Sequence, residues 1–200
     1  PDRLDSTGLF LDRWQRAYDR GQLRLDDGRY DAQPDIFGAC GAAAFYRRAM
    51  LEDIAVNGQY FDEALFAYYE DADLAWRAQL RGWRALYVPA AVALHARGWG
   101  DTLRKGGTTG AGPRLALRNR YLLLFKNAAW RTILARLPGM QLRDLPRLAY
   151  MLIFRPAALL ALVDIPRMLP AMLRKRKIIR ARQTVPDAAL LAWFTRDWNE

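Results

Sequence analysis

Residues 61–95 carry the pattern that most constrains how this chain can fold. An apolar run over residues 61–69 changes at Asp71 into a helical pattern that continues to Arg81, where Gly82 is a natural stop. Residues 83–88 then alternate as a strand does, until a proline interrupts them. A helix of about ten residues rises about 15 Å and a strand of five or six returns about 17–20 Å, so the strand should end beside the start of the helix. The pattern predicts an α/β fold.

Two adjacent carboxylates, Glu70 and Asp71, stand at the start of this predicted helix. Backbone N–H groups and the helix dipole favour negative charge there, so such a carboxylate stays ionised near neutral pH and can accept a proton from a bound hydroxyl. His95, the only histidine, follows the strand and is expected within reach of the pair. From the residues alone, helix capping is the commoner role for such a pair, and a structural hydrogen bond is the commoner role for a lone histidine.

The other segments before residue 128 are less regular. Residues 1–36 carry turn signals and predict an irregular arm, while residues 36–41 predict a short buried strand or loop whose glycines either pack closely or line a cleft. Helical patterns run from about residue 43 to 56 and from about 113 to 127, the second starting at a proline. Glycine and threonine predominate between residues 98 and 112, which is typical either of a loop that closes over a substrate or of a plain connector.

The net charge of +10 is concentrated in one apolar segment. Residues 131–182 hold 12 Lys and Arg but only 2 Asp, and five prolines between residues 138 and 170 are expected to cut the region into short helices. Its longest apolar stretch, residues 148–163, is interrupted by Arg155 and Pro156 and is shorter than the roughly 20 residues of a spanning helix. Basic and apolar together favour helices that lie in the interface of an anionic membrane. The basic run at residues 174–177 is as readily a solvated face, and nucleic-acid binding is a weaker alternative.

Cysteine usage and the chain start add two expectations. Cys40 is the only cysteine, so the chain forms no internal disulfide, and the residue is expected to be a small buried apolar side chain. The first residues lack the apolar region of a signal peptide, and the sequence starts without methionine in loop-like sequence. We expect a piece of a longer protein.

A series of short motifs in residues 4–127 resembles the second half of bacterial family 2 glycosyltransferases, in particular the rhamnosyltransferase and galactofuranosyltransferase branch. Several motifs in the same order and at sensible spacing are more specific than any one of them alone. The resemblance rests on Gly38-Ala39-Cys40-Gly41-Ala42-Ala43, Tyr46-Arg47-Arg48, Tyr60-Phe61-Asp62-Glu63, Phe66-Ala67-Tyr68-Tyr69-Glu70-Asp71-Ala72-Asp73-Leu74, Arg81-Gly82-Trp83, Tyr87-Val88-Pro89 and His95.

The resemblance implies a GT-A fold and transfer of a sugar from a nucleotide-diphosphate donor with inversion. It implies that Asp71 is the general base on the acceptor hydroxyl and that Glu70 binds or orients the acceptor sugar. His95 matches a histidine that in some members ligates the divalent metal, Mn²⁺ or Mg²⁺, which holds the donor diphosphate. We assign substrate binding to Gly38, Ala39, Cys40, Gly41 and Trp76, although a tryptophan in such a pattern is more often a core residue.

The family's donor half, with its βαβ unit and its Asp-x-Asp metal motif, has no counterpart before Gly38, and Asp71-Ala72-Asp73 falls at the acceptor site instead. We therefore expect residues 1–127 to be the acceptor-side half of a GT-A domain and residues 128–200 to be a basic, amphipathic, membrane-associating helical region. The expected partners are a nucleotide sugar, a glycan or polyprenyl-linked acceptor and an anionic membrane surface, without nucleic acid. The expected location is the cytoplasmic face of a bacterial inner membrane, in cell-surface polysaccharide synthesis. The alternative is a non-catalytic, membrane-associated interaction module derived from such an enzyme.

Overall fold

The computed structural model describes residues 3–95 and 111–194, and it is a mixed α/β structure in which helices predominate. The glycine- and threonine-rich segment expected to be a lid or a connector lies almost wholly outside the described residues. The strands are β1 (Leu9–Leu11), β2 (Ala17–Asp19), β3 (Asp35–Ile36) and β4 (Ala85–Leu86). The helices are α1 (Arg48–Ile54), α2 (Glu70–Leu80), α4 (Ala111–Asn127), α5 (Trp130–Phe154), α6 (Ala161–Ala181) and α7 (Asp187–Leu191), with the short 3-10 helices η1 (Pro156–Leu160) and η2 (Ala192–Phe194).

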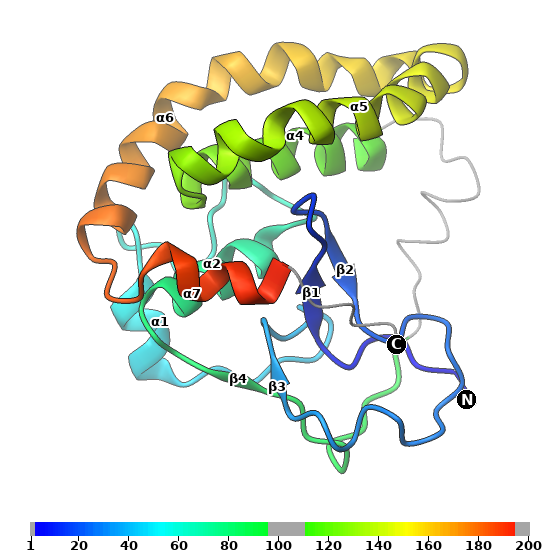
Figure 1. The fold of residues 1–200 in the computed structure, drawn as a ribbon, viewed down its shortest axis with the longest axis vertical. Coiled ribbons are helices and arrows are strands. Elements are labelled where there is room, and N and C mark those ends of the chain that lie inside the picture. The colour runs from blue at the N-terminus through cyan, green and yellow to red at the C-terminus, as the bar shows by residue number, and fades with distance from the viewer. Residues whose placement is uncertain (1–2, 96–110, 195–200) are drawn as a thin grey trace.

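Three long helices form one layer, and the strands lie below it. Figure 1 shows α4, α5 and α6 along the top of the molecule, α2 and α7 beneath them, the β1–β2 pair beside α2 and α7, and the β3–β4 pair lower still. Each sheet is one antiparallel pair: β1 with β2, where Phe10 faces Tyr18, and β3 with β4, where Ile36 faces Ala85. The expected α/β class is therefore confirmed at this coarse level.

The N-terminal segment is more regular than expected, because residues 9–19 form a hairpin rather than part of an irregular arm. Leu9, Phe10 and Leu11 are all buried, and the turn between the strands is closed by Asp12, whose carboxylate accepts hydrogen bonds from the backbone of Trp14 and Arg16. The Leu9 N–H also donates to the Gly38 carbonyl, so this hairpin contacts the segment that follows β3.

The helix and strand expected over residues 71–88 are largely confirmed. Helix α2 runs from Glu70 to Leu80, and Gly82 takes the left-handed φ of 84° that ends it. The strand is shorter than expected, since only Ala85 and Leu86 pair with β3. Helix α1 also starts later than the pattern indicated, because residues 43–47 are not helical.

The expectation that prolines cut residues 131–182 into short helices is wrong. Pro138 and Pro146 lie inside α5, and Pro166 and Pro170 lie inside α6, so two helices of 25 and 21 residues result. A proline inside a helix removes one hydrogen bond and crowds the preceding turn. Burial of the inner faces offsets this cost, through side chains such as Met140, Met151 and Met172. Pro156, by contrast, stands at the first turn of η1, where proline is readily accommodated.

One helical run among the described residues, Pro156–Ala181, is long and apolar enough to cross a membrane, judged by length and composition. This is weak support for a membrane span, because core helices of soluble proteins pass the same test. The charged contacts that α6 makes with the rest of the molecule decide between these cases and are described below.

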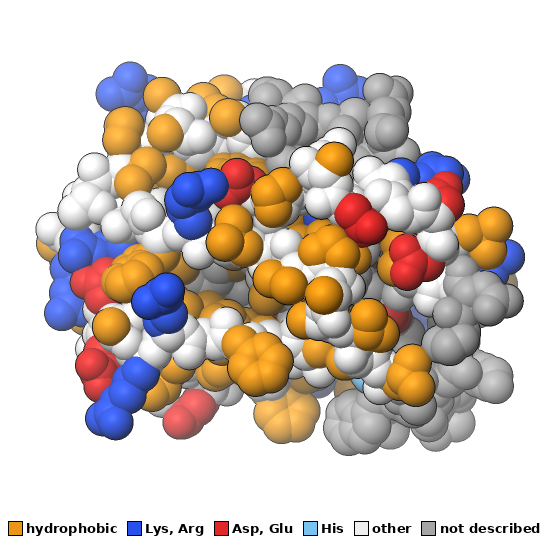
Figure 2. Space-filling model, turned by 90° about the horizontal axis from the view of Figure 1, so that it is seen from below, with side chains coloured by type: hydrophobic (Ala, Val, Ile, Leu, Met, Phe, Trp, Pro, Cys, Tyr) orange, Lys and Arg blue, Asp and Glu red, His pale blue; other side chains and the backbone are white. Residues whose placement is uncertain are grey.

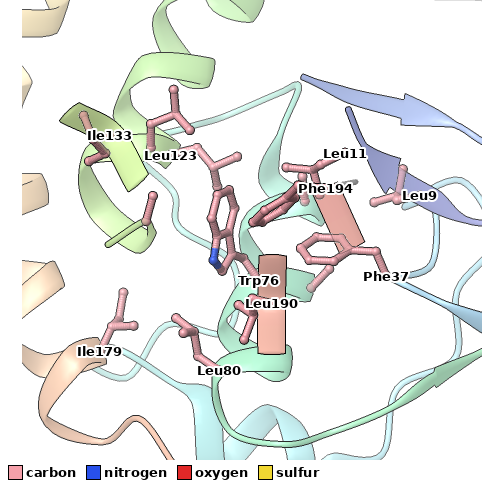
Figure 3. Close-up of a cluster of buried hydrophobic side chains, with 14 of the residues drawn as sticks. Leu9, Leu11, Phe37, Trp76, Leu80, Leu123, Ile133, Ile179, Leu190 and Phe194 are labelled. Carbon is pink, nitrogen blue, oxygen red and sulfur yellow. The ribbon is translucent and has the colours of Figure 1, made fainter. Parts of the chain in front are cut away.

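The main core joins segments from both ends of the chain. Figure 3 shows Trp76 from α2 in the middle of a cluster that reaches from Leu9 to Phe194. The Trp76 ring packs against Phe194 and Phe37, with ring centroids 5.2 Å and 6.2 Å away. The C-terminal α7 and η2 thus complete the core around α2, which fixes this helix relative to the helical layer.

A buried network of charged groups ties α2 to α4 and α6. The Asp73 carboxylate accepts hydrogen bonds from Arg77 Nε at 2.9 Å, Lys126 Nζ at 2.9 Å and Asn127 Nδ2 at 2.8 Å. Lys126 Nζ also donates to Asp62 at 2.6 Å, and Lys175 of α6 donates to the other oxygen of Asp62. The Asp73–Arg77 pair, at the i,i+4 spacing of a helix, therefore belongs to a larger structural network.

The basic run at residues 174–177 divides between inside and outside. Lys175 pairs with Asp62, and Arg176 is buried, donating to the carbonyls of Phe125 and Ala128 at the end of α4. Arg174 and Lys177 are exposed. Arg176 therefore holds α6 against the end of α4, Lys175 holds it against the segment before α2, and the other two charges face outward.

Candidate active site

The backbone that leads into the acid pair is held in an unusual conformation. Phe66, Tyr68 and Tyr69 all have positive φ, at 63°, 67° and 70°, and Tyr69 is the residue immediately before α2. Non-glycine residues rarely adopt this left-handed region, and each such residue costs on the order of 1 kcal/mol or more. Strain of this kind persists only where neighbouring structure enforces it, and it gathers at functional sites.

Helix α4 supplies the groups that enforce this conformation. The side-chain amide of Asn119, which is fully buried, donates to the carbonyls of Leu65, Ala67 and Tyr68 at 2.7–2.8 Å. The neighbouring Arg118 donates to the carbonyl of Leu65 at 3.0 Å. These contacts position the first turn of α2, where the two carboxylates stand.

Asp71 is held by backbone N–H groups rather than by a cation. Its Oδ2 accepts a hydrogen bond from Gly41 N–H at 3.1 Å, and its Oδ1 lies 2.8 Å from Ala72 N. Burial raises the pKa of Asp71, the two backbone N–H groups act against this, and the nearby Asp19 carboxylate adds to the rise. A carboxylate with a raised pKa that pairs with no cation among the described residues is suited to accept a proton.

Asp71 acts on two neighbouring polar groups, Glu70 and Tyr46. Burial and the charge of Asp71 raise the pKa of Glu70, and its Oε2 is buried without a hydrogen-bond partner in the described structure. The Tyr46 hydroxyl is likewise buried and unpartnered there, and burial together with Asp71 raises its pKa to about 12. Buried polar atoms are usually paired, so these two are free to bind a ligand.

Two residues near the acid pair have a role that the sequence did not indicate. Asp19, at the end of β2, interacts with both Asp71 and the thiol of Cys40. Burial is the main reason that the pKa of Cys40 rises to about 12, so this thiol stays protonated. The apolar run in β1, followed by turn residues 12–16 and a short alternating stretch, is a signal for the hairpin that carries Asp19, although not for its approach to Asp71.

A cleft of about 480 Å³ lies next to this arrangement. Ala39, Cys40 and Tyr46 line it together with Leu74 and Ala75 of α2, and its wall extends to β4 and His95. Apolar side chains predominate around it, and Figure 2 shows apolar side chains gathered over the centre of the face seen from below. Asp71 and Glu70 are not among the described residues that line the cleft. The acid pair is connected to the cleft through Gly41, which binds Asp71 and whose neighbours Cys40 and Ala42 line the cleft.

His95 lies apart from the acid pair, and its expected role as a metal ligand is not supported by its neighbours. Its Nδ1 is 2.7 Å from the Asp5 carboxylate, at the cleft. Among residues 3–95 and 111–194, no three His, Cys, Asp or Glu side chains are grouped so that they could hold a metal ion. A single His–Asp pair does not complete the coordination of Mn²⁺ or Mg²⁺. The described residues by themselves therefore do not fit a metal site.

The predicted substrate-binding residues fall into two groups. Ala39 and Cys40 line the cleft, and Gly41 binds Asp71 through its N–H. Gly38 also borders the cleft, but its main constraint is packing, since a Cβ there would overlap the Cβ of Ala75. Trp76 is a correction: it is only 2% exposed within the core, so its ring is not available to a sugar.

Comparison with known proteins adds no relative: no family model, no curated protein and no solved structure matches the chain.

Proposed function

We propose that this chain forms the acceptor side of an inverting glycosyltransferase of the GT-A type, with Asp71 as the general base. The observation that carries the proposal is the environment of Asp71: a carboxylate with a raised pKa at the end of an enforced, strained loop, bound within the described part of the chain by backbone N–H groups alone. Structural carboxylates in the same molecule differ, because Asp73, Asp144 and Asp164 are each paired with arginine or lysine.

The reaction assigns a distinct task to each group. Asp71 takes the proton from an acceptor hydroxyl while the oxygen attacks the anomeric carbon of a nucleotide-diphosphate sugar from the side opposite the leaving diphosphate. Glu70 and the Tyr46 hydroxyl, both unpartnered in the described structure, provide an acceptor and a donor for the other hydroxyls of the acceptor sugar. One base suffices for inversion, since a single in-line displacement needs no covalent intermediate.

The donor side is the less supported part of the proposal. The resemblance implies a divalent metal, Mn²⁺ or Mg²⁺, that binds the donor diphosphate and neutralises the charge of the leaving group. His95 is placed beside Asp5 at the cleft, which offers two ligands at most. We propose that a donor half outside residues 1–127 supplies the nucleotide site, and that the acceptor is a glycan or polyprenyl-linked sugar at the cytoplasmic face of a bacterial inner membrane.

The test is sugar transfer by the intact protein that contains this chain, with nucleotide-diphosphate sugars and a lipid-linked acceptor. Asp71→Asn should lower kcat by about 10²–10⁴-fold, because it removes the base, and should leave the Kd for the nucleotide sugar unchanged. Asp35→Asn is the matched control, since this carboxylate pairs with Arg84 on the surface and should not affect turnover. Turnover of Asp71→Asn at the normal rate would exclude the base assignment, and absence of transfer by the unaltered intact protein would favour a non-catalytic module.

A further inference from the structure

We propose that the outward face of α5, with the turn that follows it, rests in the headgroup interface of an anionic phospholipid bilayer without crossing it. The face is a stripe of exposed apolar side chains at helical spacing: Leu134, Leu142, Leu145, Leu152 and Ile153. Leu142 and Ile153 are each 70% exposed, while Ile133, Met140 and Met151 on the opposite face are buried. Along a helix axis this stripe extends about 28 Å, at about 1.5 Å per residue.

The apolar surface continues around the turn into α6. Phe154 is 63% exposed at the end of α5, and Leu160, Leu162 and Val163 are exposed on the far side of η1. In Figure 1 this turn is the end of the helical layer at the right of the view, on the opposite side of the molecule from the face shown in Figure 2. A continuous apolar surface of this length is unusual on a monomeric soluble protein and indicates a partner.

The charges around this surface favour an anionic lipid. Residues 131–182 contain two acidic residues, and both are engaged inward: Asp144 is bound by Arg16, Arg120 and Tyr121, and Asp164 by Arg114. Of the exposed cations of the segment, Arg167 acts on Asp164 and helps to lower its pKa. The others, Arg131, Arg143, Arg174, Lys177 and Arg182, form no ion pair with a carboxylate among the described residues. Apolar side chains flanked by cations are the pattern of an interfacial helix on an anionic membrane.

A second copy of the chain is a poorer occupant of the same surface. Symmetric dimers pair a patch with itself, so exposed cations would face the same cations across the contact. Anionic headgroups, by contrast, complement these charges while the acyl region accepts the leucines. The lipid is therefore the occupant that both features of the surface support.

Contacts of α6 argue that the surface lies on the bilayer and does not enter it as a spanning hairpin. Lys175 pairs with Asp62, Arg176 binds two carbonyls at the end of α4, and Asp164 pairs with Arg114. A spanning α6 would have to break these ion pairs and carry the charges into hydrocarbon, which is costly. The candidate span from Pro156 to Ala181 is thus better explained as a helix docked on the protein.

Vesicle flotation tests the proposal with phosphatidylcholine vesicles that contain about 30% phosphatidylglycerol, and with phosphatidylcholine alone as the neutral comparison. A variant with four apolar side chains of α5 replaced should have a partition coefficient on anionic vesicles at least about 100-fold lower than the unaltered chain. It carries Leu142→Gln, Leu145→Gln, Leu152→Gln and Ile153→Gln. The matched control Leu23→Gln, Leu25→Gln alters two exposed leucines of the N-terminal segment and should change it less than twofold. Arg143→Gln, Arg167→Gln, Arg174→Gln should abolish the preference for anionic vesicles.

A spectroscopic measurement keeps the test independent of folding defects. A polarity-sensitive fluorophore attached to Leu152→Cys should shift to the blue on addition of anionic vesicles, whereas the same label at Leu23→Cys should not. Absence of flotation by the unaltered chain, an equal loss in the leucine control, or a dimer that the α5 variant dissociates would each overturn the proposal. Resistance of the bound chain to alkaline carbonate extraction would show a spanning helix and overturn it as well. The inference does not rest on sugar transfer, since Asp71→Asn should float like the unaltered chain.

Discussion

Replacement of Lys126 with methionine should destabilise the fold by about 3 kcal/mol at pH 7. Lys126 is fully buried and donates to two carboxylates, Asp62 at 2.6 Å and Asp73 at 2.9 Å. Loss of one partner in a buried ion pair typically costs about 3–5 kcal/mol, because the other charge remains in a medium that solvates it poorly. We expect the lower end of this range, since Asp73 keeps Arg77 and Asp62 keeps Lys175.

The pKa of Asp73 depends on the same interaction. Burial alone would raise this pKa, but Lys126 and Arg77 outweigh it and lower the pKa from 3.8 to about 2. At about 1.4 kcal/mol per pKa unit, this corresponds to roughly 2 kcal/mol of stabilisation. Because the folded-state pKa is depressed, the stabilisation is complete above the unfolded pKa and is lost as the pH falls towards 2.

The assay is urea unfolding followed by circular dichroism at several pH values. In Lys126→Met the pKa of Asp73 is no longer lowered by the lysine, so the carboxylate takes up a proton more readily. The difference in unfolding free energy from the unaltered chain should therefore shrink as the pH falls from 7 to 4. Arg84→Met breaks an exposed pair with Asp35 and should cost less than about 1 kcal/mol. A loss below about 1 kcal/mol for Lys126→Met, or one independent of pH, would refute the reasoning.

Three further predictions concern the residues around the candidate site. Gly38→Ala should lower the free energy of urea unfolding by about 1–3 kcal/mol, because the new Cβ would overlap that of Ala75. Gly41→Ala should change it by less than about 1 kcal/mol, because its Cβ would lie at an ordinary 3.5 Å from Asp71 Cβ. Equal effects would contradict the packing described. Cys40, with a pKa of about 12, should react with a thiol reagent about 10³-fold more slowly in the folded chain than in urea, and fast labelling of the folded chain would disprove its burial. Asp71→Asn should raise the unfolding free energy at pH 7. A carboxyl group whose pKa is raised in the folded chain destabilises the fold once the pH rises through that pKa, and asparagine carries no charge. A less stable variant would show that the charge is well solvated.

The sequence predicted the elements whose signals are local. Helix α2 and its end at Gly82 follow from the helical period and a glycine, and the Asp73–Arg77 pair follows from helical spacing. The acid pair at the start of α2 was found in the same way. Such features need no knowledge of distant residues, so the pattern of a short segment was sufficient to place them.

The sequence failed where the decisive contact comes from far along the chain. The prolines of α5 and α6 are tolerated because the inner faces of these helices are buried against α4 and η1, which no local pattern reveals. Trp76 is buried because α7 and η2, more than 100 residues later, return to cover it. The approach of Asp19 to Asp71 likewise depends on how the first hairpin packs against the segment after β3.

Two carboxylates on the same helix, two residues apart, show how the fold assigns different roles to the same side chain. Asp73 points into the helical layer, where Lys126, Arg77 and Asn127 lower its pKa to about 2 and make it a structural anchor. Asp71 lies on the other side of the first turn, where burial and Asp19 raise its pKa and only backbone N–H groups bind it. A helix turns about 100° per residue, so positions two apart face nearly opposite directions. The Asp73 network fixes α2 against α4, and Asn119 of α4 holds the strained loop, so the general base that we propose at this turn depends on the packing of α4 behind it.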